Sequence, residues 1–306
     1  MARAGRGSKK TTSVLWGLAV LSFVIGAALI GAARLRENDF PPEAVKGVVS
    51  VPDSAPPKTS PEPTSQKPAS SDPMPEKWVR VALIIDDVGF SLSAARQLAE
   101  VKIPVTWSII PYQAYSLASL KLAKEKGIPA MLHLPMEAEV DRPGLKFQVN
   151  LEMEPETVRT FVRQAVKSLP GVIGLNNHRG SRATSTPKVM EAVLAETKAQ
   201  GLLFVDSWTS GKSVGYATAI RMGVPALKNE VFLDHDLDPA AMKKALERAY
   251  SIARRKGSVV VIGHIRPETL RFLKALSEMP AKDVKWVTVP EIIRQSSGPG
   301  QGGVSP

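Results

Sequence analysis

Several apolar, strand-like runs of this 306-residue chain end in side chains that can bind a metal ion or transfer a proton, and the four histidines occur only at such ends. In a parallel sheet or a closed barrel, the carboxyl ends of all strands open onto one face, so residues far apart in sequence meet there. The pattern therefore predicts one shared site, interpreted first as a metal site. The side chains at these ends are Asp86, Asp87, His133, His178, Asp206, Asp234, His235 and His264.

Asp86 and Asp87 are adjacent carboxylates at the end of a very apolar run. Two like charges in such a place repel each other and raise the pKa of one of them unless a cation or a donor compensates. Capping of the following helix is the structural alternative, but Gly89 and Ser91 lie closer to its expected start. The pair is therefore interpreted as functional, with one carboxylate binding a metal and its neighbour accepting a proton from water.

His133 and His178 are the histidines that best fit a metal site with these carboxylates. A lone histidine such as His133 is more often a satisfied core residue, whereas the run 176–181 has too many hydrogen-bonding groups for a buried strand and predicts a ligand-shaped loop. One carboxylate with two neutral imidazoles is a common zinc set, while magnesium and calcium prefer more carboxylates. The candidate ligands are one carboxylate of the Asp86–Asp87 pair, His133 and His178, with Glu137 in reserve.

His264 ends a further buried run and precedes a helix that starts with proline, which suits a general acid, with a capping role as the alternative. Asp206 is expected to orient His264 or to bind substrate. Part of the run 234–238 is interpreted as a solvated loop or a helix cap. The predicted substrate-binding residues are Asn177, Arg179, Ser181 and Asp234.

The elements that must position these residues are expected between about 78 and 295, where strand-like runs alternate with amphipathic helices. The strands are continuous apolar runs, as in sheets that are covered on both faces. This alternation favours an α/β fold built as a (β/α) barrel, with an open doubly wound sheet as the alternative. Helices are predicted at 91–102, 114–126, 155–169 and 239–256.

The N-terminal residues predict a membrane anchor. Residues 11–33 carry no charge, and at about 1.5 Å per residue they are long enough to cross a hydrocarbon core of about 30 Å. The basic residues in 1–10 favour a cytoplasmic N-terminus and a translocated remainder, hence a single-pass protein of the inner membrane with its domain in the periplasm. A cleaved signal peptide is the alternative, although the apolar run exceeds the usual length of about 7–15 residues.

Residues 34–77 are rich in Pro, Ser, Glu and Lys and are expected to form a semi-extended, disordered tether, and 296–306 a disordered low-complexity tail. The net charge of +11 does not indicate nucleic-acid binding, because much of the excess flanks the predicted membrane segment. The absence of cysteine is compatible with an oxidising periplasm, since a domain of this size needs no disulfides.

Taken in order, the motifs IDDVG, PVTWSIIP, LHLPME, GLNNHRGSR, LFVDSWT, VFLD and IGH resemble the divergent polysaccharide deacetylase family, which is related to the NodB-type carbohydrate esterases. The resemblance covers Val81 to about Leu276. It implies a (β/α) barrel variant of about seven strands and metal-assisted removal of acetyl groups from an N-acetylated sugar polymer. It also fits a protein that faces the cell wall, for which peptidoglycan is the nearest polymer.

The resemblance implies Asp86 as the general base, Asp87 and His133 as metal ligands, and His264 as the acid that protonates the leaving amine. The second metal histidine of the NodB-type motif is Glu137 in this chain, and the segment NNHRGS replaces an Arg-x-Pro-x-Gly motif. We therefore expect His178 to supply the second imidazole. The rival interpretation is a membrane-tethered glycan-binding protein that kept the barrel but lost the chemistry, and a purely structural envelope partner ranks last.

Overall fold

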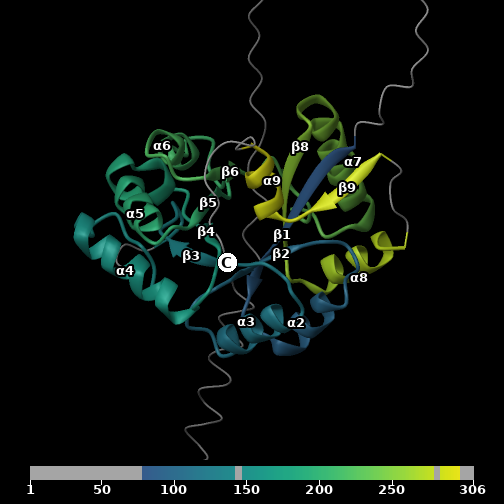
Figure 1. Ribbon diagram of the computed structural model, residues 1–306, viewed down its shortest axis with the longest axis horizontal. Coiled ribbons are helices and arrows are strands. Elements are labelled where there is room, and N and C mark those ends of the chain that lie inside the picture. The colour runs from purple at the N-terminus through teal and green to yellow at the C-terminus, as the bar shows by residue number, and fades with distance from the viewer. Residues whose placement is uncertain (1–77, 142–146, 279–282, 297–306) are drawn as a thin grey trace, which may run out of the picture. The chain divides into compact units, whose positions relative to one another are not determined.

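The computed structural model describes residues 78–141, 147–278 and 283–296 (Figure 1). Among these residues, no helix is both long and apolar enough to span a bilayer. The predicted anchor at 11–33 and the predicted tether at 34–77 lie outside the described residues, as does all but the first residue of the predicted tail.

One sheet of nine parallel strands forms the centre of the described region. The strand order is β6-β5-β4-β3-β2-β1-β8-β7, and β9 also pairs with β1. The predicted α/β class with parallel strands is therefore confirmed. The strands are β1 (Val79–Val88), β2 (Thr106–Ile109), β3 (Ala130–Met136), β4 (Gly174–Arg179), β5 (Leu203–Asp206), β6 (Ala226–Lys228), β7 (Val231–Phe232), β8 (Ser258–His264) and β9 (Val284–Val287).

Most helices of the described region surround this sheet on its outer side in Figure 1. Most of them connect consecutive parallel strands, as right-handed crossovers require. They are α2 (Leu92–Ala99), α3 (Ser116–Glu125), α4 (Pro155–Ser168), α5 (Pro187–Ala199), α6 (Gly215–Arg221), α7 (Pro239–Lys256), α8 (Pro267–Leu276) and α9 (Val289–Ser296), with a 3-10 turn, η1, at Ala183–Ser185.

The sheet curls back on itself without a hydrogen-bonded ladder between its two ends. β6 and β7 stand at opposite ends of the strand order, yet only Asn229 and Glu230 separate them in sequence. The backbone N–H of Asn229 donates to Asp206 O in β5, and that of Glu230 donates to Val260 O in β8. The two-residue link thus joins the ends of a half-barrel, which is why the strands enclose an inner face.

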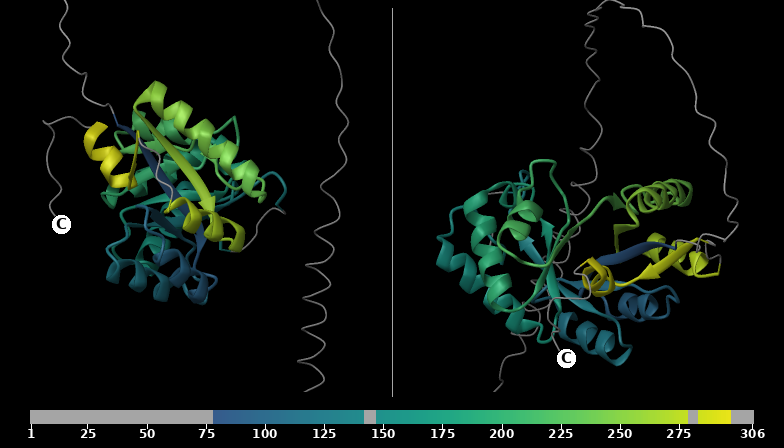
Figure 2. Two further views of the ribbon diagram at one scale, coloured as in Figure 1. Left: turned by 90° about the vertical axis from the view of Figure 1, so that its right-hand side faces the viewer. Right: turned by 45° about the horizontal axis from the view of Figure 1, so that its top comes forward.

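Side chains alternate between this inner face and the outer face that packs on the helices. α9 covers the starting ends of the strands (Figure 2, left), and the N–H of Val289 donates to the hydroxyl of Thr106, the first residue of β2, at 3.1 Å. This end of the interior is therefore filled mainly with apolar side chains, which leaves the other end for the ionisable groups. The inner cluster contains Ala82, Ile84, Met131, Leu203, Val205, Val260, Ile262, Val287, Val289 and Ile292.

The helix boundaries follow local sequence signals. Ser91 caps α2 by accepting a hydrogen bond from the N–H of Ala94, and Asp238 caps α7 in the same way. α4, α5, α7 and α8 each have proline in the first turn, where its missing N–H costs nothing. Gly257 ends α7 with a φ of +85°, the left-handed conformation that glycine adopts without strain. The predicted helices at 155–169 and 239–256 are confirmed within one residue.

Gly174 is predicted to be essential for the packing of β4 against β5. A Cβ at this position would lie 2.5 Å from Leu203 Cγ and 2.6 Å from the Leu203 carbonyl oxygen, so the backbone of β5 would have to move. Gly174→Ala should lower the free energy of unfolding by about 1–3 kcal/mol. Urea unfolding measures this loss. Gly211→Ala is the control, because a Cβ there meets nothing within 4 Å; equal stability of the two variants would contradict the prediction.

Candidate active site

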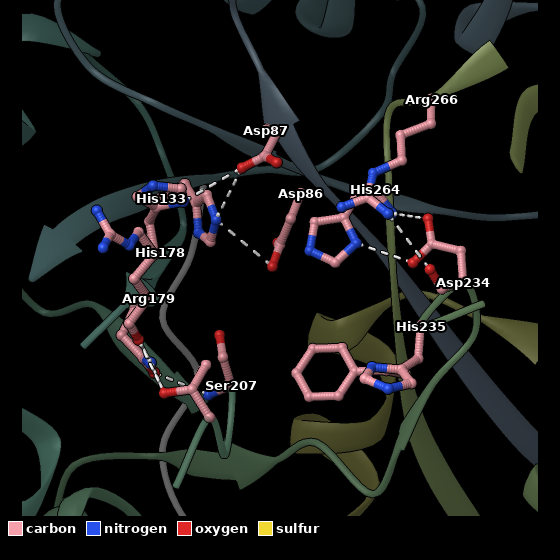
Figure 3. A pocket seen from close by; sticks show the side chains of 13 residues that line it. Asp86, Asp87, His133, His178, Arg179, Ser207, Asp234, His235, His264 and Arg266 are labelled. Atoms are coloured by element: carbon pink, nitrogen blue, oxygen red, sulfur yellow. Dashed lines mark hydrogen bonds and ion pairs between the residues drawn. The ribbon is translucent and has the colours of Figure 1, made fainter. Parts of the chain in front are cut away.

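The carboxyl ends of the strands open onto a pocket of about 340 Å³ (Figure 3). Most of the residues predicted from strand ends line this pocket, including those that the sequence placed on different strands. It is lined by Asp86, Asp87, His133, Asn177, His178, Arg179, Ser207, Thr209, Phe232, Asp234, His235, His264 and Arg266.

The two adjacent carboxylates of β1 both reach the pocket, although consecutive residues of a strand normally face opposite ways. Asp86 faces the inside by the alternation of β1. Asp87 has a left-handed backbone with a φ of +63°, at a point where the pairing of β1 with β2 shifts register. As a result, Asp86 Oδ2 and Asp87 Oδ1 lie 3.5 and 3.4 Å from the same atom, His133 Nε2. A left-handed non-glycine residue costs about 1–3 kcal/mol, so the surrounding contacts must stabilise it.

Asp87, His133 and His178 form a cluster with the composition of a metal site. Asp87 Oδ1 lies 3.2 Å from His178 Nδ1, and one ligand atom from each of the three residues lies within 4.8 Å of the others. Asp87 Oδ1 is buried and, among the residues that the structure describes, accepts no hydrogen bond. A buried carboxylate oxygen that faces two ring nitrogens is compensated well by a cation between them. These residues therefore fit a divalent metal ion.

The pKa values of the two carboxylates shift in opposite directions. Burial raises the pKa of Asp86 above its ordinary value, against the opposing charges of His133 and His264. Burial alone would also raise the pKa of Asp87, but the imidazoles of His133 and His178 beside its carboxylate lower it well below the usual range. Asp87 thus stays ionised, as a metal ligand must, while Asp86 takes up a proton more readily, as a general base must.

Asn176 is a buried residue of the site that the sequence analysis did not single out. Its Oδ1 accepts from His133 Nδ1 at 2.8 Å, and its Nδ2 donates to Asp86 Oδ1 at 2.9 Å and to the Ser207 hydroxyl at 3.2 Å. The predicted loop at 176–181 is wrong in its first part, because β4 continues to Arg179. The strand can contain these polar side chains because the inner face of β4 opens onto the pocket at the carboxyl end of the strand. Alternation along β4 was the signal that could have identified Asn176.

His264 lies across the pocket from this cluster and is held by Asp234 (Figure 3). Asp234 Oδ1 accepts from His264 Nδ1 at 2.8 Å, and Oδ2 accepts from the His264 backbone N–H at 2.7 Å and the Thr269 hydroxyl at 2.6 Å. Burial alone would lower the pKa of His264, but the hydrogen bond to Asp234 and the charge of that carboxylate raise it above its ordinary value. Asp234, predicted as a substrate-binding residue, therefore orients the imidazole instead.

The prediction that Asp206 orients His264 is wrong. Val205 belongs to the inner cluster, so the next residue of β5 faces outward. The completely buried Asp206 carboxylate accepts from the N–H of Trp208 at 2.9 Å, the Ser213 hydroxyl at 2.6 Å and the N–H of Tyr216 at 2.9 Å. It holds the loop after β5 against the start of α6.

The reserve ligand, Glu137, is also not at the site. Its carboxylate pairs with Arg182 at 2.8 Å and accepts from the N–H of Leu151 at 3.0 Å, outside the cluster of metal-ligating groups. The position of Glu137 is determined by the segment after β3, whose course the strand pattern does not predict.

The predicted substrate contacts near the end of β4 have different positions. Asn177 lines the pocket, but its amide links β4 to the loop after β5, accepting from Ser207 N–H at 2.8 Å and donating to Arg179 O at 2.7 Å. Arg179 also lines the pocket and pairs with Asp141. Ser181 is not among the lining residues, and its hydroxyl accepts from the N–H of Glu139.

The curled sheet and its strand-end pocket define a protein of the parallel α/β half-barrel class. A crystal structure of an uncharacterized protein, ATU2773 from Agrobacterium tumefaciens C58, has the same fold, with a TM-score of 0.66 and 20% identity over 74% of this chain and 92% of that one.

Comparison of sequences then gives the family. Residues 83–293 match the divergent polysaccharide deacetylase family. The chain is 29% identical to the uncharacterized protein YibQ of Escherichia coli K12, over 71% of this chain and 68% of YibQ. It is 33% identical to an uncharacterized protein of Haemophilus influenzae, over 68% of this chain and 74% of that one. The chain belongs to the divergent polysaccharide deacetylase family, as its motifs predicted.

Asp234→Asn is expected to lower the pKa of His264, because the amide removes the negative charge that offsets the effect of burial. A proton NMR titration of the metal-free protein, following the His264 ring, measures the shift. Asp236→Asn is the control, since it removes an exposed charge from the same loop. An unchanged pKa of His264 in Asp234→Asn would show that the Asp234 carboxylate does not stabilise the protonated imidazole.

Proposed function

We propose that the protein is a metal-dependent hydrolase that removes acetyl groups from an N-acetylated glycan of the cell envelope. The proposal rests on the cluster of Asp87, His133 and His178. In this cluster Asp87 Oδ1 is buried and accepts no hydrogen bond from the described residues. Membership of the divergent polysaccharide deacetylase family supports a glycan substrate. The buried carboxylate of Asp86 and the imidazole of His264 supply the two proton-transfer groups that amide hydrolysis needs.

The donor set favours zinc or a similar transition metal over magnesium or calcium, because it offers two imidazoles and one carboxylate rather than several oxygens. A metal of this kind supplies Lewis-acid activation of water and of the acetyl carbonyl group when it is bound.

The side chains of the pocket divide the remaining work. Asp86 accepts the proton of the attacking water, for which its raised pKa suits it. His264 gives its Nε2 proton to the departing amine as the carbon–nitrogen bond breaks, so the products are acetate and a free amine. Asp234 keeps that imidazole protonated and in place. Phe232 lies beside His264 with the two rings nearly parallel and their centroids 6.2 Å apart.

The cellular setting of this activity is also part of the proposal. The uncharged segment 11–33 and the basic residues before it support a single-pass anchor in the inner membrane with a cytoplasmic N-terminus. The tether at 34–77 would then carry a periplasmic domain at about 78–295, for which peptidoglycan is the nearest acetylated glycan.

Zinc binding is the first test of the proposed ligands. The full chain, purified in detergent, should bind one equivalent of zinc, whereas Asp87→Ala and His178→Ala should lose it, because two remaining ligands hold the ion poorly. Elemental analysis and competition with a chromogenic chelator measure the affinity. His235→Ala is the matched control, because His235 lines the pocket but lies outside the ligand cluster. Full zinc retention in His178→Ala would refute the ligand set.

Acetate release from N-acetylglucosamine oligomers or peptidoglycan fragments is the test of the chemistry. Asp86→Asn and His264→Gln should keep zinc but lower kcat by about 10²–10⁴-fold, since each removes one proton-transfer group. If the wild type binds the glycan without releasing acetate, and Asp86→Asn and His264→Gln bind it equally well, the result would favour a non-catalytic glycan-binding protein.

The pH dependence of the activity is a second test of His264. Activity of the wild type should fall as the pH rises through the raised pKa of His264, and Asp234→Asn should move this fall to lower pH.

A further inference from the structure

Asn176 connects two groups that have different roles in the proposed reaction. Its side chain is completely buried on the inner face of β4. The amide oxygen accepts from His133 Nδ1 at 2.8 Å and from the hydroxyl of Ser108. The amide nitrogen donates to Asp86 Oδ1 at 2.9 Å and to the hydroxyl of Ser207 at 3.2 Å. All four hydrogen-bonding positions of the amide are therefore used.

These contacts determine which way the amide faces. The Asp86 carboxylate only accepts when it is ionised, so the NH₂ group of Asn176 must point toward Asp86. The amide oxygen then points toward His133, which must donate from Nδ1. A neutral imidazole with its proton on Nδ1 has its lone pair on Nε2, and Nε2 is the atom 3.4 Å from Asp87 Oδ1. The free lone pair thus faces the proposed metal position.

We infer that Asn176 is a positioning residue that fixes the Nδ1–H tautomer of His133 with its oxygen and the orientation of Asp86 with its nitrogen. The inference rests on the proposed function for the roles of these two neighbours. One buried amide then prepares both a metal ligand and a general base. Ser108 in β2 and Ser207, directly after β5, complete the hydrogen bonding of the amide. A flip of the amide would turn its oxygen toward the ionised carboxylate of Asp86, which cannot donate, so its two tasks cannot be exchanged.

Two substitutions separate these tasks. Asn176→Asp keeps an acceptor for His133 Nδ1–H but replaces the donor to Asp86 with a second carboxylate oxygen. Asn176→Leu has nearly the same shape and removes both hydrogen bonds. The inference therefore predicts that the aspartate variant keeps the metal and loses turnover, whereas the leucine variant loses both.

Zinc affinity and kcat of the full chain in detergent measure the separation. Asn176→Leu should bind zinc about 10–100-fold more weakly, as expected when the hydrogen-bond partner of a metal-ligating histidine is removed. Asn176→Asp should bind zinc like the wild type, with kcat about 10²-fold lower and KM little changed, because Asp86 is misplaced. Thr197→Val is the control for replacing a buried polar side chain with an apolar one outside the pocket, and its zinc affinity should match that of the wild type.

The tautomer is measured without metal. Because the chain has four histidines, ¹⁵N-histidine labelling of the metal-free protein gives a spectrum in which His133 can be assigned with His133→Gln. Burial alone would lower the pKa of His133, but the charges of Asp86 and Asp87 raise it above its ordinary value, so the spectra are recorded at alkaline pH, where the ring is neutral. There the wild type and Asn176→Asp should show His133 with its proton on Nδ1, and Asn176→Leu should show a mixture of tautomers.

An unprotonated Nδ1 of His133 in the wild type would overturn the inference, as would an unchanged spectrum and zinc affinity in Asn176→Leu. If the leucine variant does not fold, unchanged kcat in Asn176→Asp overturns it. Failure of the wild type to bind zinc would contradict the proposed function, and the histidine spectra of the metal-free protein would still decide the role of Asn176.

Discussion

The two adjacent carboxylates at the end of β1 are placed where an uncompensated negative charge costs roughly several kcal/mol. Around them the fold gathers groups that reduce this cost: the imidazoles of His133 and His178 beside Asp87, and the amide of Asn176 beside Asp86. The compensation is unequal, since Asp87 Oδ1 faces ring nitrogens without a hydrogen bond from the described residues. The different surroundings give two chemically identical side chains different proton affinities.

The curvature of the sheet brings the two halves of the pocket together. β1, β3 and β4 carry the carboxylates and the proposed metal-binding imidazoles, while β8 carries His264 and the residue that holds it follows β7. In a flat sheet β4 and β7 would be separated by all the strands between them. α9 and the inner apolar cluster stabilise the opposite end, and the ionisable groups line the pocket at the carboxyl ends of the strands.

Much of this arrangement follows from the sequence, and the remainder depends on contacts that no local pattern encodes. Amphipathic periodicity and a proline in the first turn located α4 and α7 closely, and apolar runs located the long strands. β6 and β7 have too few residues to show a pattern, so the strand number could not be predicted. Alternation would have excluded Asp206 and included Asn176. The left-handed backbone of Asp87 and the pairing of Glu137 with Arg182 arise from tertiary contacts and required the structure.

The backbone conformation of Asp87 also determines how the proposed metal-binding site could be lost by substitution during evolution. Aspartate and asparagine are among the few non-glycine residues that adopt a left-handed conformation readily. A single exchange of Asp87 for asparagine would therefore leave the turn at the end of β1 undisturbed while removing the anionic member of the proposed ligand set. A lineage can pass from a metal-binding to a metal-free pocket at this position with the barrel intact, so the overall fold of a relative carries little information about its chemistry, and the residue at this turn carries much more.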